Sequence, residues 1–167
     1  MRRSPDHYDL EILDQQFAHF VPEIVYQAIY VPKGELPPTR DILKKAALLK
    51  YYHQWGRKGD FGLVVIHRKS EMPVGGAFVR HYHPQEAGYG FVSAQYPELS
   101  IALLPDHRSK GLGTQLLKTL LTALRKTGCA GISLSVDQRN PAFDLYKRFG
   151  FEVVKEEGNP TMLLVFS

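Results

Sequence analysis

The sequence predicts one mixed α+β domain, in which helices pack on a largely antiparallel sheet. The chain has 167 residues, about the length of one domain. Its strand and helix patterns interleave in the order β-α-α-β-β-β-α-β-α-β-β. Since no internal repeat, low-complexity segment or linker divides the chain, we expect a single domain over residues 1–167.

The first half of the chain begins with a strand pattern at residues 8–14, followed by apolar residues at helical spacing. Pro22 interrupts this spacing, so the helix either begins there or is broken there. Residues 32–38 hold three of the eleven prolines and predict a loop. A second helix is expected to begin at Thr39 and Asp41. Its expected buried face consists of Ile42, Leu43, Ala46, Leu49 and Tyr52.

The second half begins with an antiparallel hairpin, predicted from the strand patterns at 61–67 and 74–82. Residues 83–97 are rich in Pro, Gly and Tyr, and we expect them to form a loop over a site. The other expected elements are a strand at 99–104, an amphipathic helix with leucines from 112 to 124, a strand at 132–137, a short helix at 141–149 and strands at 151–154 and 162–166.

The composition is that of an ordinary soluble globular protein, with 44% apolar and 23% charged residues. The single cysteine, Cys129, excludes an internal disulfide framework and favours a reducing compartment. We interpret it as a small residue in a helix-to-strand turn. No apolar stretch is long enough for a membrane span or the apolar core of a signal peptide, so we expect a cytoplasmic protein with no membrane partner.

The net charge of +4 and the pI of about 9.1 are compatible with two kinds of partner. A nucleic-acid-binding protein would carry its basic residues on one clustered face, but here they are scattered in small groups. A polyphosphorylated small molecule needs the same electrostatics with fewer charges. Composition alone does not decide between them.

The clearest functional signal lies where the strand at 99–104 ends. Two glycines one residue apart, Gly111 and Gly113, precede a long helix. Glycines allow backbone N–H groups to approach an anion, and the helix adds unsatisfied donors and the positive end of its dipole. Arg108 and Lys110 add formal positive charge. The turn therefore predicts an anion site against the N–H groups of residues 109–114.

The spacing of these residues narrows the class of anion that the turn is expected to bind. The Rossmann fingerprint requires a third glycine where the chain has Leu116, and a P-loop requires Lys after its last glycine, where the chain has Thr114. The pattern that fits is R-x-x-G-x-G, formed by Arg108, Gly111 and Gly113. It resembles the acyl-CoA pyrophosphate motif of the GNAT superfamily of N-acetyltransferases.

About thirty residues later, the segment from Asn140 to Phe151 is similar to the second signature of that family. Asn140, Leu145, Tyr146, Gly150 and Phe151 are present, although the spacing from Asn140 is one residue shorter than in the family. The two motifs cover residues 98–151. The first 97 residues resemble the family only in the order of their elements.

The resemblance implies a mixed, mostly antiparallel sheet with helices on both faces, in which two central parallel strands, 99–104 and 132–137, splay apart. The acetyl-CoA cosubstrate would lie in that cleft, with its pantetheine arm paired to the first strand. The residues implied in cofactor binding are Leu103, Leu104, Arg108, Ser109, Lys110, Gly111, Leu112, Gly113, Thr114, Asn140 and Tyr146.

Four of these residues also acquire roles from the resemblance. The oxyanion would be stabilised by a backbone N–H at the strand end, from Leu104 or its neighbour Leu103. Tyr146 would be the general acid that protonates the departing thiolate; its alternative role is a tyrosine packed on the core. Asn140 would bind the pantetheine amides, cap the helix that begins at Pro141, or do both.

The general base is expected to be Glu98 at the start of the splayed strand, where some relatives have a carboxylate. An ordinary solvated glutamate at a strand end is an equal alternative. His81 and His83 are other candidates for the base. This H-x-H pair is also compatible with a metal, but no third ligand is identifiable, so we expect no metal.

Acceptor specificity is expected from the segments that match no motif, namely the 30–40 loop, the helix after it and the 88–91 loop. Tyr82, Tyr89, Phe91 and Tyr96 would form an apolar or cation-binding wall, or pack in the core.

The main hypothesis is direct transfer of an acetyl group from acetyl-CoA to a primary amine of a small molecule or peptide. A non-catalytic acyl-CoA-binding or sensing domain is the alternative, and a basic nucleic-acid-binding module is the third hypothesis. We expect no nucleic-acid partner. A homodimer is compatible with the resemblance, but no feature of the sequence specifies its interface.

Overall fold

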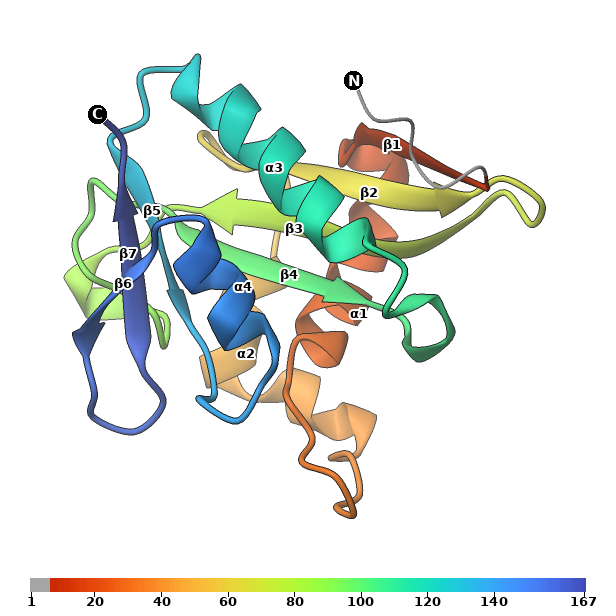
Figure 1. Ribbon diagram of the computed structural model, residues 1–167, viewed down its shortest axis with the longest axis horizontal. Helices are drawn as coiled ribbons and strands as arrows, with labels where there is room; N and C mark the ends of the chain where they lie inside the picture. Colours follow the sequence, from red (N-terminus) through yellow and green to blue (C-terminus); the bar gives the residue numbers. More distant parts are fainter. Residues whose placement is uncertain (1–6) are drawn as a thin grey trace.

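The computed structural model describes residues 7–167, which form one seven-stranded mixed sheet with helices packed on both faces (Figure 1). The strand order is β1-β2-β3-β4-β5-β7-β6. The order of helices and strands along the chain is the predicted one. The strands are β1 Tyr8–Ile12, β2 Phe61–His67, β3 Met72–Arg80, β4 Glu98–Leu103, β5 Gly131–Ser135, β6 Glu152–Lys155 and β7 Thr161–Val165.

The sheet contains one parallel pair, β4 and β5, and its other neighbours are antiparallel. The two parallel strands share one register pair, Glu98 with Ser133, and the Ser133 N–H donates to Pro97 O at 3.0 Å. Beyond this point the strands diverge toward their carboxyl ends (Figure 1). The expected splayed pair is therefore confirmed, and Glu98 marks its closed end.

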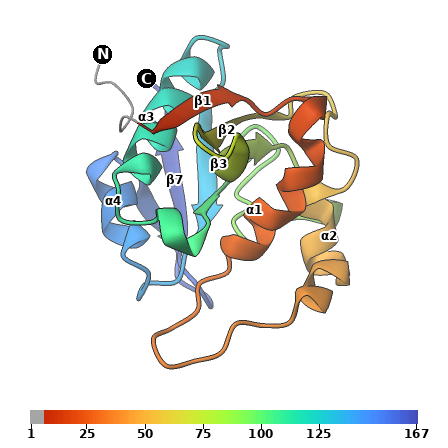
Figure 2. The ribbon, with the colours of Figure 1, turned by 90° about the vertical axis from the view of Figure 1, so that its right-hand side faces the viewer.

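The helices cover opposite faces of the sheet. α3 (Leu112–Arg125) and α4 (Ala142–Arg148) pack on one face, and α1 (Val21–Gln27) and α2 (Ala46–Tyr52) on the other (Figure 2). Within residues 7–167, no helix is long and apolar enough to cross a membrane. Short 3-10 helices lie at Gln15–Phe20, Arg40–Lys44, Pro84–Glu86 and Pro105–His107.

The amphipathic helix predicted after the two-glycine turn is α3, which anchors one of the two hydrophobic cores. All six of the leucines that recur at helical spacing are at least 95% buried, and each contributes about 2 kcal/mol through burial. Because this core holds the helix rigidly on the sheet, the start of α3 lies at a fixed place beside the end of β4. The buried leucines are Leu112, Leu116, Leu117, Leu120, Leu121 and Leu124.

The helix expected from Thr39 onward differs from the prediction. The extended backbone of Lys45 (ψ 140°) divides it into a 3-10 helix and α2. The helical spacing of apolar residues therefore does not continue from one helix into the other. The expected buried face was correct only in part, because Leu43 and Tyr52 pack against the core, whereas Ala46 is exposed and the buried residues are Tyr51 and Trp55. Pro22, by contrast, lies in the first turn of α1, which begins at Val21, so a helix start at this proline is the one of the two predicted alternatives that the structure has.

The end of α2 is held in place by a buried arginine of β3. Arg80 is 1% exposed and forms a two-pronged ion pair with Asp60, with Nε–Oδ1 at 3.0 Å and Nη2–Oδ2 at 2.8 Å. Its Nη1 also donates to the carbonyl oxygens of Lys50 at 2.9 Å and His53 at 2.7 Å. These bonds satisfy carbonyl groups that a helix end leaves unpaired. Arg80 therefore fixes the end of α2 relative to β3, the strand that pairs with β4.

Candidate active site

The turn between β4 and α3 presents a run of unpaired backbone donors. The first hydrogen bond of α3 runs from Gln115 N–H to Gly111 O at 3.2 Å. Within the described chain, the N–H groups of residues 109–114 donate to no backbone oxygen. Gly111 adopts φ +80° and Ser109 φ +60°, and these left-handed residues turn the chain into the helix. The predicted anion site therefore has the donors it needs.

The same turn has space for a ligand. A Cβ atom added at Gly111 or Gly113 would meet no atom within 4 Å, so this side of the turn is open. Leu112, between them, is 1% exposed and anchors the turn to the core. Ser109, Lys110 and Thr114 are exposed. In the predicted turn, the side chain of Leu112 thus points into the core, while the residues around it are exposed to solvent.

Arg108 is held beside the carboxyl end of β4, on the open side of the splayed pair. Its Nε donates to Leu103 O at 3.0 Å and its Nη2 to Gln27 Oε1 at 3.1 Å. The guanidinium therefore joins the end of β4 to the end of α1, and it remains exposed. This arrangement fixes a positive charge beside the open N–H groups.

The two predicted backbone donors at the end of β4, Leu103 and Leu104, point in opposite directions. The Leu104 N–H donates to Val74 O at 2.8 Å, so it is already engaged with the β3 side. Hydrogen-bonding directions alternate along an antiparallel strand, and the register pairs Leu103 with Gly75 and Ile101 with Ala77. The N–H groups of Leu103 and Ile101 consequently point toward the gap. Leu103 fits the predicted role better than Leu104, and Ile101 is an additional candidate.

Helix α4 lies at the other side of the gap. Asn140 Oδ1 accepts a hydrogen bond from Ala142 N–H at 3.0 Å, so this residue does cap the helix. Tyr146 is 7% exposed and its ring lies 5.7 Å from that of Phe151. No described residue hydrogen-bonds the Tyr146 hydroxyl, and burial raises the pKa of this phenol above its ordinary 10.0. The phenol therefore stays protonated and able to donate.

Glu98 is not the solvated glutamate that was its alternative. It is 3% exposed, and burial raises the pKa of its carboxyl from 4.5 to about 7. Hydrogen bonding from the Tyr51 hydroxyl opposes this rise, with smaller effects from Gly90 N–H and the Lys50 ammonium. Oε1 nevertheless has no hydrogen-bond partner of good geometry among the described residues. A buried carboxyl with one unpartnered oxygen is suited to taking up a proton.

The 83–97 loop closes over Glu98, as expected for a loop over a site. A Cβ added at Gly88 would lie 2.3 Å from Glu98 Oε1 and 2.5 Å from the Tyr51 hydroxyl. One added at Gly90 would lie 2.5 Å from Ser135 N on β5. The two glycines therefore let the loop backbone lie directly on the closed end of the splay.

The aromatic residues expected to form an acceptor wall are divided between two roles. Tyr82 is 2% exposed and packs with Tyr51, and Phe91 packs on the same hydrophobic core. Tyr89 is 65% exposed, and Tyr96 is half-buried. Of the four, Tyr89 presents the most surface to a ligand.

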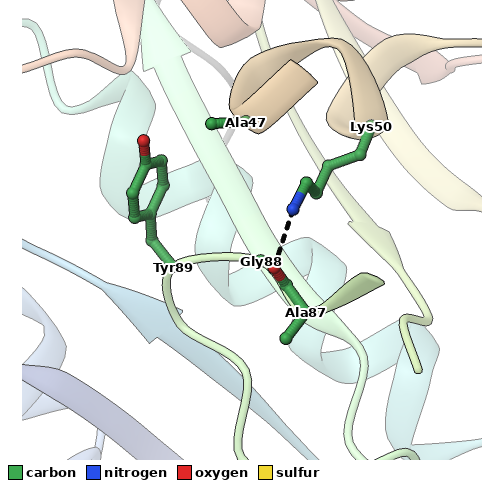
Figure 3. Close-up of a pocket in the computed structure, with 5 residues that line it drawn as sticks. All are labelled: Ala47, Lys50, Ala87, Gly88 and Tyr89. Atoms are coloured by element: carbon green, nitrogen blue, oxygen red, sulfur yellow. Dashed lines mark hydrogen bonds between the residues drawn. The ribbon is translucent and has the colours of Figure 1, made fainter. Parts of the chain in front are cut away.

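A small cavity lies between α2 and this loop. It has a volume of about 80 Å³, and the Lys50 ammonium spans it to donate to Ala87 O at 2.9 Å, with Tyr89 on the opposite side (Figure 3). A larger hollow of about 460 Å³ adjoins it along α2 and includes His53, Arg57 and Glu86. Both are lined by segments from which acceptor specificity was expected.

The other candidates for the base lie outside this network. His81 and His83 are exposed, and His81 Nδ1 is 3.3 Å from Ala94 O. Among residues 7–167, no group of three or more His, Cys, Asp or Glu side chains is placed to hold a metal ion.

Sequence reasoning did not identify Tyr51, which contacts Glu98 from α2. Tyr51 is buried on α2, and Trp55 is buried just beyond the end of this helix, which ends at Tyr52. The four-residue spacing of these two aromatic residues therefore does not mark a helix face, and no local pattern around Tyr51 indicated its contact with Glu98.

Comparison with known proteins identifies the fold that holds this site. The model of the acetyltransferase (GNAT) family matches residues 29–151, which is most of the chain. The chain belongs to the GNAT family. Its single domain, with one parallel pair in a mixed seven-stranded sheet, is a GNAT fold.

Solved structures have the same fold over almost the whole length of this chain. The PaiA N-acetyltransferase of Thermoplasma acidophilum, in complex with coenzyme A, is 17% identical, with 95% of this chain and 99% of that chain covered at a TM-score of 0.64. A GNAT family acetyltransferase of Brucella melitensis, in complex with acetyl-CoA, is 19% identical, with 96% and 89% covered at a TM-score of 0.59. At these identities the likeness shows the fold alone.

One curated relative matches a shorter segment. The mycothiol acetyltransferase of Corynebacterium jeikeium (strain K411) is 42% identical over 55 residues, which are 32% of this chain and 16% of that protein. The match therefore spans about a sixth of the relative's length.

Proposed function

We propose that this GNAT protein transfers the acetyl group of acetyl-CoA directly to a primary amine of a small molecule or peptide. The observation that carries the proposal is the arrangement along β4. Unpaired N–H groups of residues 109–114 follow its open end, and the buried Glu98 lies at its closed end. From Glu98 to Leu103 the strand spans about 17 Å at about 3.3 Å per residue, room for an extended pantetheine arm.

The turn and the open strand edge would hold acetyl-CoA. The N–H groups of residues 109–114 and the side chains of Arg108 and Lys110 would bind the pyrophosphate. Asn140 still has its Nδ2 donors for the pantetheine amides, since only its Oδ1 is engaged in the helix cap. The backbone of Ile101 and Leu103 would pair with the same arm.

Three groups would carry out the transfer. Glu98 accepts a proton from the amine as its nitrogen bonds to the acetyl carbon, and it then releases this proton to solvent. The N–H of Leu103 or Ile101 stabilises the negative charge that develops on the carbonyl oxygen. Tyr146 donates a proton to the sulfur as the carbon–sulfur bond breaks, and solvent restores that proton. A base with a pKa of about 7 is half ionised at neutral pH, where general-base catalysis is efficient.

Direct transfer is supported by the position of the single cysteine. Cys129 lies in the turn between α3 and β5, and its thiol donates to Gly131 O at 3.2 Å. The gap opens toward the other ends of β4 and β5. This thiol is therefore poorly placed to form an acyl-enzyme, and the amine is expected to attack the acetyl group itself.

The test is release of the coenzyme A thiol from acetyl-CoA in the presence of a panel of amines. Thiol release that depends on the amine, with acetylated amine found by mass spectrometry, is the expected result. Calorimetric binding of acetyl-CoA without turnover on any amine would instead favour the sensing domain. Absence of binding would remove both functions.

A further inference from the structure

A single hydroxyl group connects α2, the 83–97 loop and Glu98. Tyr51 donates to Glu98 Oε2 over 2.5 Å, and its oxygen accepts from Tyr89 N–H at 2.7 Å. These contacts join residues 47 and 38 positions apart in the sequence. The phenol oxygen has thus one donor and one acceptor partner, which fixes the direction of its proton toward the carboxylate.

The surroundings leave this hydroxyl little freedom. Tyr51 is 5% exposed, and its ring lies 5.4 Å from that of Tyr82 in an edge-on contact. Gly88 packs so closely that a Cβ there would clash with both the hydroxyl and Glu98 Oε1. Arg80 and Lys50 tie the same helix to β3 and to the loop. The distance between Tyr51 and Glu98 is therefore held from three sides.

We propose that Tyr51 is a positioning residue for the acetyl transfer, whose hydroxyl holds Oε2 of Glu98 and leaves Oε1 to receive the proton of the amine. This inference rests on the proposed function, in which Glu98 is the base. It assigns the two carboxylate oxygens different roles. Oε2 is engaged by Tyr51, whereas Oε1 is buried and has no hydrogen-bond partner of good geometry in the described chain.

The other charged and titratable groups around Glu98 contribute less to its ionisation. Arg80 is its cross-strand neighbour, but its guanidinium is bonded to Asp60 and to backbone carbonyls. Lys50 is directed to Ala87 O, and the Tyr82 hydroxyl has no partner among the described residues. After burial, which raises the pKa of Glu98, the Tyr51 hydrogen bond is the largest influence and lowers it.

The Tyr51 hydrogen bond determines in which direction the pKa of Glu98 changes when the hydroxyl is removed. A hydrogen bond donated to a carboxylate favours its ionised form, so removing the Tyr51 hydroxyl makes Glu98 harder to ionise. The pKa of Glu98 therefore rises further in Tyr51→Phe. A hydrogen bond to a charged group is strong enough that Glu98 should become about tenfold weaker as an acid.

The experiment measures the carboxyl of Glu98 without relying on activity. The side-chain carbon of Glu98 is followed by ¹³C NMR across a pH titration, with its signal assigned from Glu98→Gln. Tyr51→Phe is compared with the wild type and with Tyr52→Phe, in which the neighbouring tyrosine of α2 loses a hydroxyl that donates to Leu43 O at 2.8 Å. The pKa of Glu98 should rise in Tyr51→Phe and stay unchanged in Tyr52→Phe.

An unchanged Glu98 pKa in a folded Tyr51→Phe protein would overturn the inference, and so would an equal rise in Tyr52→Phe. The pH dependence of kcat/KM then tests the link to catalysis. The acid limb in Tyr51→Phe should move to higher pH, with the rate recovering on its alkaline side. If the NMR titration moves and the acid limb does not, Tyr51 still holds Glu98 but Glu98 is not the base, so the proposed role of Glu98 fails separately.

Discussion

Glu98 of β4 and Ser133 of β5 form the one register pair that joins the two parallel strands within the described chain. The 83–97 loop contacts both strands near this pair, with Gly88 against Glu98 and Gly90 against Ser135. Everything assigned to acetyl-CoA lies on the open side of the pair, and Tyr51, Lys50 and Tyr89 lie around its closed end. The pair therefore separates the proposed donor cleft from the proposed acceptor side.

Gly113→Asp should abolish acetyl-CoA binding while leaving the fold intact. A side chain at residue 113 enters open space, but its carboxylate would face the negative pyrophosphate at the start of α3. We expect Kd, measured by calorimetry, to increase at least about 100-fold. Gly128→Asp places the same charge in open space beyond the other end of α3; its φ of +80° adds backbone strain, so the comparison uses folded protein, which should bind normally. Normal affinity in Gly113→Asp would show that the pyrophosphate lies elsewhere.

Tyr146→Phe should slow turnover about 100-fold, the ordinary contribution of a general acid, with little change in acetyl-CoA affinity. The ring remains packed on Phe151, because only the hydroxyl is removed. Single-turnover kinetics measure the chemical step, and calorimetry measures the binding. If the chemical step is as fast as in the wild type, Tyr146 is a core residue and not the acid.

Burial of Glu98 makes the stability of the protein depend on pH in a defined window. Its pKa is raised from 4.5 to about 7, so between these values the unfolded chain has lost the proton that the folded chain retains. The free energy of unfolding therefore falls as pH rises through this window. The free energy of unfolding of Glu98→Gln, relative to that of the wild type, should therefore increase by on the order of 3 kcal/mol as pH rises from about 4.5 to about 7. Above about pH 7 the difference should stay constant. Urea unfolding at several pH values measures the difference, and a difference that stays the same through this window would contradict the assignment.

Asp60→Asn should destabilise the fold far more than the same change at Asp41. The side chain of Asp60 is 1% exposed and ion-pairs with the buried Arg80, so its neutralisation leaves a guanidinium without its counter-charge. We expect a loss of about 3–5 kcal/mol. Asp41 and its partner Lys44 are both 83% exposed, and the loss there should be about 0.5 kcal/mol or less. Chemical unfolding curves compare the two, and equal losses would contradict the structural role of Arg80.

The features that could be predicted from the sequence are local ones. The leucines of α3 recur at helical spacing, and the glycines at 111 and 113 lie within one turn, so each pattern contains its own information. The hairpin of β2 and β3 is likewise formed by neighbouring segments. The GNAT family itself was indicated by two such local motifs.

The features that could not be predicted depend on contacts between distant segments. Tyr51 and Glu98 are 47 positions apart, and nothing in either segment indicates the other. The burial of Arg80 follows from a partner 20 positions earlier and from the carbonyl groups at the end of α2. The preference for Leu103 over Leu104 required the strand register, because successive N–H groups point to opposite edges.

Direct transfer of the acetyl group to an amine is tested by following the acetyl group itself. The protein is incubated with acetyl-CoA labelled with ¹³C in the acetyl group and with a panel of primary amines, between about pH 6 and about pH 9. We expect labelled amide on at least one amine, formed at a rate that rises through about pH 7 as Glu98 ionises and that falls about 100-fold in Glu98→Gln. Acetyl-CoA that binds while no amine acquires label, or a rate that Glu98→Gln leaves unchanged, would contradict it.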